Sequence, residues 1–158
     1  MTKTIQCEIV SAEASVYSGS AEQVVAAGIL GDLGILAGHT PLLTELAPGP
    51  VRVLNEGSEE HFYVSGGFIE VQPEKVIVLA DTAVRASDLD EAAAEEARKQ
   101  AIKAMEDKSA ELDYTRAAAE LSEALAQLRT IQQLRRKAGK VVYATGRRSQ
   151  RGQRLLQR

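Results

Sequence analysis

The amino-acid sequence predicts a β + α fold, in which an N-terminal β domain is followed by an antiparallel hairpin of two helices. Three observations lead to this prediction. Hydrophobic and polar residues alternate along residues 1–86, turn-forming residues recur in the same half, and residues 88–137 contain neither glycine nor proline. Many short strands separated by turns are typical of a sandwich or a barrel, whereas an uninterrupted alanine-rich segment favours helices.

The β half is defined by alternation with a period of two, which places one side of a strand in the core and the other in water. The run at 76–80 is apolar at every position, so we expect it to form a central strand. The alternating hydrophobic residues elsewhere are Ile5, Cys7 and Ile9, then Phe62 and Val64, then Ile69 and Val71. Turn signals occur at Ser18-Gly19, Pro48-Gly49-Pro50, Asn55-Glu56-Gly57, Gly66-Gly67 and Pro73-Glu74.

Two helices are predicted in the second half, over residues 88–108 and 113–137. Ser87 and Asp90 resemble a capping box at the first helix, and Asp113 is a natural N-cap for the second. Alanine dominates the first helix and buries little area, so the contact between the helices should be thin. Two alternatives stay open: a hairpin packed permanently against the β domain, and one that releases and docks elsewhere. The predicted apolar stripe of the second helix is Leu121, Leu125, Leu128, Ile131 and Leu134.

Length and charge narrow the class of protein. The 158 residues suit one domain with an appendage. No apolar run approaches the roughly 18 residues of a membrane-spanning helix, and the first residues lack the apolar segment of a secretory signal. Residues 1–86 carry four basic and eleven acidic groups, whereas residues 135–158 carry nine basic groups and no acidic ones. The basic end is therefore expected to meet a negatively charged partner.

The stretch at 31–43, GDLGILAGHTPLL, is the first candidate for a ligand-binding loop. A P-loop needs a glycine five positions before Gly38 and a lysine directly after it, but these positions hold Leu33 and His39. We therefore interpret the glycines as conformational. They form either a stiff loop between strands that presents Asp32 and His39 for recognition, or a turn that closes a β-hairpin.

Motifs for catalysis and metal binding are missing as well. The two histidines and the single cysteine show none of the spacings typical of zinc sites, and no nucleophile motif occurs. The acidic pairs Glu59-Glu60 and Glu95-Glu96 are interpreted as solvated, and His61 as a surface residue of a strand. Cys7 alternates with core positions and is interpreted as buried. These features argue against an active site.

Five segments that follow one another in a fixed order carry a specific resemblance. They are GDLGILAGHTPLL, PGPVRV, YVSGGFIEVQP, VLADTAVRASDLDEA and LDYTRAAAELSEALAQLRTI. Together they closely resemble the epsilon subunit of the bacterial rotary ATP synthase over roughly residues 4–138. The resemblance implies a β-sandwich over residues 1–86, a regulatory antiparallel two-helix hairpin over residues 87–138, and no catalytic residues.

The resemblance also implies partners. The sandwich would bind the gamma subunit and rest on the ring of c subunits, coupling rotation to ATP synthesis in the alpha–beta head. The chain would lie peripherally at the cytoplasmic face of the bacterial inner membrane, associated with the membrane only indirectly. The implied contacts with the c ring are Asp32 and His39, and the family commonly has glutamate at the first of these positions.

In this family the hairpin can extend into the head and inhibit ATP hydrolysis, with basic groups of the second helix facing acidic residues of the beta subunits. The resemblance carries this role over to four positions: Arg129, Arg135, Arg136 and Lys137.

Some members of the family bind ATP through [IL]-D-x-x-R-A at the start of the first helix and through arginines on the second. Leu89 and Asp90 match this motif, but Ala93 stands where arginine is expected. The second-helix positions hold Glu123 and Gln127. Losing cations that pair with phosphate should weaken anion binding, so we expect weak or absent ATP binding and no other cofactor.

Residues 139–158 have no counterpart in the resemblance. They form a basic tail that is either an extension without a role of its own or an arm that binds acidic protein or nucleic acid. The sequence does not determine whether the tail is ordered. Its one aromatic residue is Tyr143, so we expect no specific nucleic-acid site. Two alternative functions stay open, a nucleotide-sensing regulator and a nucleic-acid binder that uses the tail.

Overall fold

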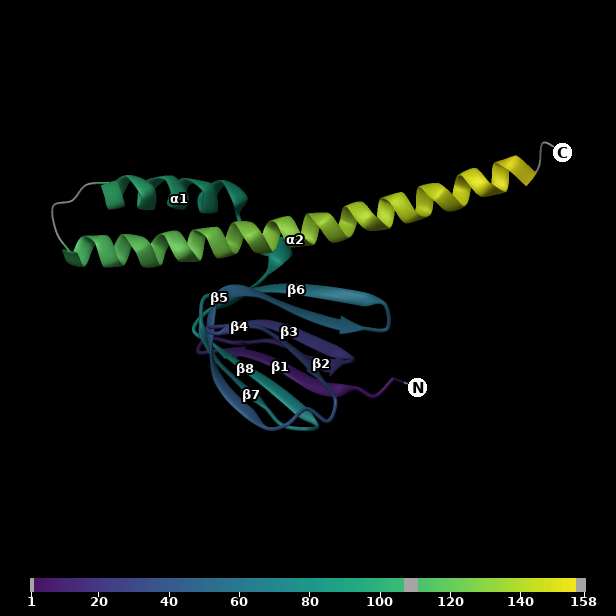
Figure 1. Cartoon of the computed structure of the whole chain (residues 1–158), viewed down its shortest axis with the longest axis horizontal. Helices are drawn as coiled ribbons and strands as arrows, with labels where there is room; N and C mark the ends of the chain where they lie inside the picture. Colours follow the sequence, from purple (N-terminus) through teal and green to yellow (C-terminus); the bar gives the residue numbers. More distant parts are fainter. Residues whose placement is uncertain (1, 107–110, 156–158) are drawn as a thin grey trace.

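The computed structural model describes residues 2–106 and 111–155, including their side chains except at 111–112 and 139–155. The N-terminal half is a two-layered β-sandwich, and a hairpin of two helices lies along one side of it (Figure 1). The predicted fold class is therefore confirmed. Burial alternates along the strands as the sequence pattern predicted, and the helices α1 and α2 follow in the part of the chain predicted to be helical.

Nine strands, one 3₁₀ turn and two α-helices occur in the described part of the chain. The strands are β1 (Ile5–Ser11), β2 (Ser15–Ala21), β3 (Gln23–Gly28), β4 (Gly31–Leu36), β5 (Leu42–Asn55), β6 (Ser58–Val64), β7 (Gly67–Val71), β8 (Lys75–Ala80) and β9 (Ala83–Arg85). The helical elements are η1 (Ala86–Asp88), α1 (Glu91–Glu106) and α2 (Glu111–Leu155).

The strands form one continuous sheet that folds over itself through the long strand β5. The order is β2-β1-β8-β7-β5-β3-β4, with β6 paired to β5 and β9 paired to β6. The start of β5 pairs with β7, and the remainder pairs with β3 and β6. The first layer therefore contains β2, β1, β8, β7 and the start of β5. The second layer contains the rest of β5 with β3, β4, β6 and β9.

The inward-facing side chains of both layers make one hydrophobic core. Ile5, Cys7 and Ile9 are fully buried in it, as their alternation predicted. The other predicted core positions of β6 and β7 belong to the same cluster. Burial, reinforced by the nearby Glu8 carboxylate, raises the pKa of the Cys7 thiol to about 12. The thiol is therefore protonated at neutral pH and unreactive.

The predicted central strand is β8, which pairs with β1 on one edge and β7 on the other. Its side chains at Val76 and Val78 are fully buried in the core, whereas Leu79 on the other side is 47% exposed. A strand that is apolar on both sides is therefore central in the sheet but covered on one side only.

The first helix begins later than predicted. Asp90 caps α1, because its Oδ1 accepts a hydrogen bond from the backbone N–H of Ala93 at 3.1 Å. Leu89 has extended backbone angles and separates η1 from α1. The predicted capping box at Ser87 was wrong. Ser87 and Asp90 are both residue types that cap helices, so residue type alone could not decide between them. Only the backbone conformation between them decides which one acts.

The second helix also has different bounds from those predicted. It begins at Glu111, which places Asp113 inside the first turn, where an acidic side chain interacts favourably with the helix dipole. It continues to Leu155 instead of ending near Lys137. Glycines interrupt this last part of the sequence, but each costs only about 1 kcal/mol relative to alanine, and no proline is present to stop the helix.

Small side chains dominate the contact between the helices. Ala94 and Ala101 are the buried residues of α1. Within the predicted stripe of α2 only Ile131 is buried, and Leu125 is 49% exposed. The buried side chains of α2 are Ala117, Ala124, Ala126, Thr130 and Ile131. The buried side chains of the two helices are therefore mostly small, as the alanine-rich composition predicted, and most of the predicted leucine stripe of α2 is not fully covered.

Candidate functional site

The stretch at 31–43 begins with a strand, which excludes the stiff loop, one of the two alternatives that the sequence left open. β4 takes up the first six residues and forms a hairpin with β3, and Ile35 fills a core position. Gly31 and Gly38, at either end of the strand, have φ values of +131° and +83°, which side chains other than glycine rarely adopt. The alternative reading, in which these glycines close a hairpin, is the one that applies at Gly31.

Asp32 lies beside the tip of the β3–β4 hairpin, which we define as residues 28–32. Gly28 and Gly31 are paired at the end of the strands, so Ile29 and Leu30 form the turn. Their side chains are 53% and 96% exposed. Aliphatic residues are uncommon in such turns, which favour glycine, asparagine and aspartate. The hairpin tip therefore presents a carboxylate next to two exposed apolar side chains.

His39 lies at the opposite end of β4. Its backbone N–H donates to the carbonyl oxygen of Leu36 at 3.1 Å, and the N–H of Gly38 donates to Pro73 at 2.8 Å in the β7–β8 turn. The four residue steps of strand from Asp32 to Leu36 span about 13 Å at roughly 3.3 Å per step. The structure therefore does not bring Asp32 and His39 together, and they belong to two separate surfaces.

The outer side of the first layer carries an exposed apolar face, defined here by Leu43, Phe68 and Leu79. Their side chains are 68%, 51% and 47% exposed. Phe68 is paired directly with Leu79 on β8 and with Glu45 on β5, so these side chains share one side of the sheet. Adjacent exposed apolar side chains on a sheet are typical of an interaction surface.

Acidic residues are interspersed with this apolar face. Glu45 lies opposite Phe68, and Glu70 lies opposite Leu43, both in the register of β5 with β7. A third carboxylate, that of Glu8, is paired with Lys75 at 3.2 Å. A partner that fits this face would offer apolar groups together with basic ones.

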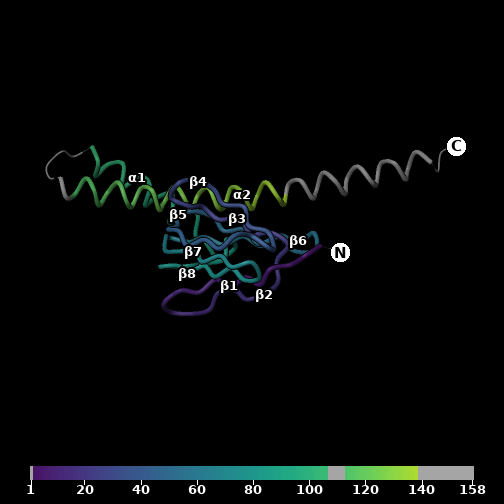
Figure 2. The backbone as a smooth tube through the Cα atoms, turned by 60° about the horizontal axis from the view of Figure 1, so that its bottom comes forward, coloured from purple at the N-terminus to yellow at the C-terminus, as the bar shows by residue number. Residues whose placement is uncertain are grey.

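The outer side of the second layer is covered by α2. The helix contacts β5 and β6, and Figure 2 shows it on the side of the sandwich away from β1 and β2. Gly49 allows the close approach, because a Cβ atom there would lie 2.9 Å from Nη2 of Arg129 and 2.8 Å from Cβ of Ala27. Nη2 of Arg129 donates to the carbonyl oxygen of Pro48 at 3.5 Å.

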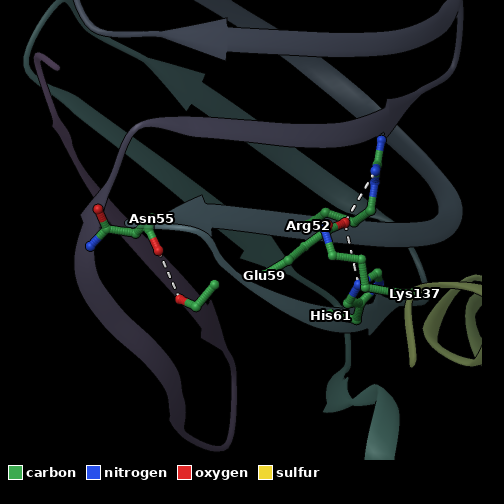
Figure 3. A network of polar contacts seen from close by, with 6 residues as sticks. Arg52, Asn55, Glu59, His61 and Lys137 are labelled. Carbon is green, nitrogen blue, oxygen red and sulfur yellow. Dashed lines mark hydrogen bonds and ion pairs between the residues drawn. The ribbon is translucent and has the colours of Figure 1, made fainter. Parts of the chain in front are cut away.

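A buried carboxylate, that of Glu59, lies beneath α2 with its side chain only 6% exposed (Figure 3). Its oxygens lie 2.7 Å from Nζ of Lys137, 3.2 Å from Nη1 of Arg52 and 3.3 Å from Nε2 of His61. Burial raises the pKa of Glu59, but hydrogen bonds from Lys137 and Arg52 and the neighbouring positive charges outweigh it. The pKa therefore lies below its usual value, and the carboxylate is ionised at neutral pH.

Sequence reasoning missed this cluster, since it placed Glu59 and His61 on a solvated surface. Both residues point outward from β6, and α2 happens to cover that side of the strand. The available signal was charge, because the acidic Glu59 contacts Arg52 and His61, which are paired directly across the sheet. The acidic Glu59 lies next to this pair and opposite the basic Lys137 of α2.

The other basic residues of α2 differ in their surroundings. Arg135 forms a bidentate ion pair with Glu91 at the start of α1. Arg136 makes no hydrogen bond or ion pair within the described residues, and it lines a pocket of about 340 Å³ with Gln133 and the Glu59 cluster. Three of the four basic positions singled out from the sequence, Arg129, Arg135 and Lys137, therefore have partners within the chain.

The two residues of the degenerate nucleotide motif have structural roles. Asp90 caps α1, and the N–H of Leu89 donates to Ala86 in η1. On α2, the carboxylate of Glu123 adds to the effect of burial in raising the pKa of Tyr63 to about 12. An acidic group is therefore close to Tyr63, in a region where a phosphate site would need cations.

Within residues 2–106 and 111–155, no group of three or more His, Cys, Asp and Glu side chains is placed to hold a metal ion. The helices of the same part of the chain include none that is both long enough and apolar enough to cross a membrane.

Comparison with protein families accounts for both halves of the chain. Residues 4–86 match the β-sandwich domain of the ATP synthase Delta/Epsilon chain, and residues 87–132 match the long α-helix domain of the same chain. The chain belongs to the ATP synthase Delta/Epsilon family. One relative, the ATP synthase epsilon chain of Chromohalobacter salexigens, is 71% identical over 138 residues, which cover 87% of this chain and 98% of the relative.

Solved structures contain chains of the same fold at much lower identity. A chain of the Euglena gracilis mitochondrial ATP synthase (OSCP/F1/c-ring in rotational state 1) superposes with a TM-score of 0.72 at 21% identity, covering 78% of each chain. A chain of the Tetrahymena thermophila mitochondrial ATP synthase central stalk/c-ring gives 0.55 at 12% identity, covering 82% of this chain and 98% of that one. The Delta/Epsilon fold is thus retained at these low identities.

The buried His61 is expected to make the stability of this Delta/Epsilon chain pH-dependent. Burial lowers its pKa, with Glu59 opposing the shift and Arg52 and Lys137 adding to it. Since the folded-state pKa lies below the unfolded value of about 6.5, the unfolded chain binds more protons on acidification. Stability should therefore fall as the pH drops from about 7.5 to about 5.5.

The measurement is urea unfolding followed by circular dichroism at both pH values. His61→Gln should flatten the dependence on pH, whereas His39→Gln should retain it. An unchanged dependence in His61→Gln would contradict the prediction.

Proposed function

We propose that the protein is a non-catalytic subunit of the central stalk of a proton-translocating ATP synthase. It couples rotation of the c ring and the gamma subunit to ATP synthesis in the alpha–beta head. The observation that carries this proposal is the exposed apolar face on a chain of the Delta/Epsilon family. One outer side of the sandwich is covered by the chain's own helix, and the other is available to a partner. Co-purification of the chain with the gamma subunit of its own synthase tests it.

The apolar face is the proposed contact with the gamma subunit. Leu43, Phe68 and Leu79 supply apolar area, and Glu45 and Glu70 supply charge that would fix the orientation of a partner. Because these side chains lie on strands of a packed sheet, the face is rigid before binding and loses little conformational entropy on association.

The proposed contacts with the c ring are Asp32 and His39. Asp32 is supported by its place in the hairpin tip, where Ile29 and Leu30 add exposed apolar surface to the carboxylate. His39 lies at the other end of β4, so it would have to meet a different part of the ring or its immediate neighbour. The two residues are therefore best replaced separately.

Asp32→Ala is expected to weaken association with the membrane sector by about fivefold. An exposed charged contact is worth about 1 kcal/mol or less, and the fold is unaffected because the side chain is exposed. The measurement is binding to membrane vesicles that lack this subunit, together with ATP-driven proton pumping after reconstitution.

His39→Ala is the parallel variant, and Glu13→Ala, in the exposed β1–β2 turn, is the matched control. Unchanged binding and coupling after replacement of both Asp32 and His39 would exclude the docking role.

The hairpin is the proposed inhibitor of ATP hydrolysis. In this proposal α2 leaves the sandwich, extends into the head and places Arg129, Arg135, Arg136 and Lys137 against acidic residues of the beta subunits. The buried side chains of α2 are mostly small, which supports such a release because a small side chain exposes little apolar area when the helix leaves.

ATP binding by the isolated chain is proposed to be weak or absent. Ala93 cannot pair with a phosphate, Asp90 is engaged as a helix cap, and Glu123 would repel an anion. Isothermal titration of the chain with ATP should give no saturable heat, and tight binding would instead favour a nucleotide-sensing role.

We further propose that the chain lies at the cytoplasmic face of the bacterial inner membrane. It would be held there by the gamma subunit and the c ring, without a direct contact of its own with lipid. Its release from washed membranes together with the alpha–beta head would support this placement.

A further inference from the structure

We propose that Glu59 is an electrostatic latch that holds α2 on the sandwich. It binds Lys137 within the chain, in competition with the acidic residues of the beta subunits. This inference deepens the proposed inhibitory role and rests on that role only for its effect on hydrolysis. The latch consists of Glu59 on β6, Arg52 on β5, His61 on β6 and Lys137 on α2 (Figure 3).

The carboxylate of Glu59 is buried on the side of β6 that faces α2. A buried carboxylate is unfavourable unless cations and hydrogen-bond donors contact it. Arg52 and His61 belong to the sandwich and stay beside Glu59 when the helix leaves, whereas Lys137 leaves with the helix. The docked state therefore contains a short charge-assisted hydrogen bond, 2.7 Å long, that the released state lacks.

The other described polar contacts between α2 and the sandwich are not ion pairs, and they include a side-chain hydrogen bond between Gln127 and Tyr63. The hydrogen bond of Arg129 goes to a neutral carbonyl group and is 3.5 Å long. The buried hydroxyl of Thr130 donates to Ala126 within α2 and does not link the helix to the sheet. Among the described residues, the Glu59–Lys137 pair is thus the one ion pair that links α2 to the sandwich.

Two internal ion pairs must also break before the hairpin can extend. Lys137 is paired with Glu59, and Arg135 is paired with Glu91 at the start of α1. Acidic residues of the beta subunits can bind these cations only after the two internal carboxylates have released them. These ion pairs would bias the ratio of docked to extended chains. That ratio would set the degree to which ATP hydrolysis is inhibited.

The test measures the distance between the sandwich and α2 in the full-length chain. Spin labels attached at Glu13→Cys and Gln132→Cys, both exposed positions, report docking by pulsed electron resonance. The native Cys7 is buried and its thiol is protonated, so it is not labelled under these conditions. Glu59→Gln should shift the ratio of docked to released helix by about tenfold toward release.

Three further variants make the result specific. Lys137→Gln removes the other half of the pair from an exposed helix position and should give the same shift without affecting the fold of the sandwich. Glu60→Gln removes the adjacent carboxylate, which pairs with Arg85 at 2.8 Å, and should leave the ratio unchanged. Arg136→Gln removes the neighbouring helix cation and should also have no effect. A docked population equal to wild type in both Glu59→Gln and Lys137→Gln would overturn the latch.

ATP hydrolysis by the reconstituted synthase separates the latch from the proposed function. With Glu59→Gln, hydrolysis should fall relative to wild type, because more of the hairpin is free to extend. A shifted distance with unchanged hydrolysis would support the latch and contradict the inhibitory role. An unshifted distance would contradict the latch whatever the hydrolysis rate.

Discussion

Removal of residues 87–158 is expected to raise ATP hydrolysis by the assembled synthase severalfold. The truncation deletes both helices and all four cations proposed to face the beta subunits. The sandwich should still fold, because its core cluster lies entirely within residues 5–80 with supporting contacts up to Ala83. The measurement is a coupled assay of hydrolysis on synthase reconstituted with the full-length or the truncated chain.

A second variant separates the charges from the helix itself. Full-length chain with glutamine at the four cationic positions should also raise hydrolysis, since the helix could extend but would lack its partners on the beta subunits. Gamma binding should be equal in all three proteins, because the apolar face lies in the first layer. Equal hydrolysis with the full-length and truncated chains would exclude an inhibitory role for this hairpin.

Phe68→Glu is expected to reduce affinity for the gamma subunit by about thirtyfold. A buried aromatic anchor in an interface commonly contributes about 2 kcal/mol or more, and the new carboxylate would join Glu45, which lies directly opposite. The side chain is half exposed in the free chain, so the fold should be little affected. Titration calorimetry with purified gamma subunit measures the change.

Leu125→Glu is the matched control for this experiment. Leu125 is an exposed leucine on α2, with an exposed fraction similar to that of Phe68, but it lies outside the apolar face. Its replacement should leave the affinity for gamma at the wild-type value. If Phe68→Glu and Leu79→Glu both bind gamma as tightly as wild type, the contact with gamma lies elsewhere on the sandwich.

The arrangement of strands was predictable in outline because each strand carries its own pattern. Ile5, Cys7 and Ile9 alternate with polar residues and are buried together in the core. The helical half was equally recognisable from its composition. The start of α1 was not, because Ser87 and Asp90 have similar local preferences and the extended conformation of Leu89 separates them.

The surfaces proposed for function were harder to predict from the sequence. A single stiff loop from Asp32 to His39 was one of the two predicted alternatives, but Ile35 is buried in the core and the segment pairs with β3 as strand β4. The two side chains consequently lie at opposite ends of a strand. The hairpin tip could be recognised as a candidate contact surface only from the structure, in which Leu30 is 96% exposed.

The class of each half follows from the sequence alone, since periodicity and turn chemistry are properties of neighbouring residues. The family likewise follows from several segments in a fixed order. Only the tertiary structure decided which outward-facing residues are covered. Glu59 and Phe68 both point away from the core, yet α2 buries the first and leaves the second exposed. That difference depends on where a distant helix docks, and no pattern along a single strand records it.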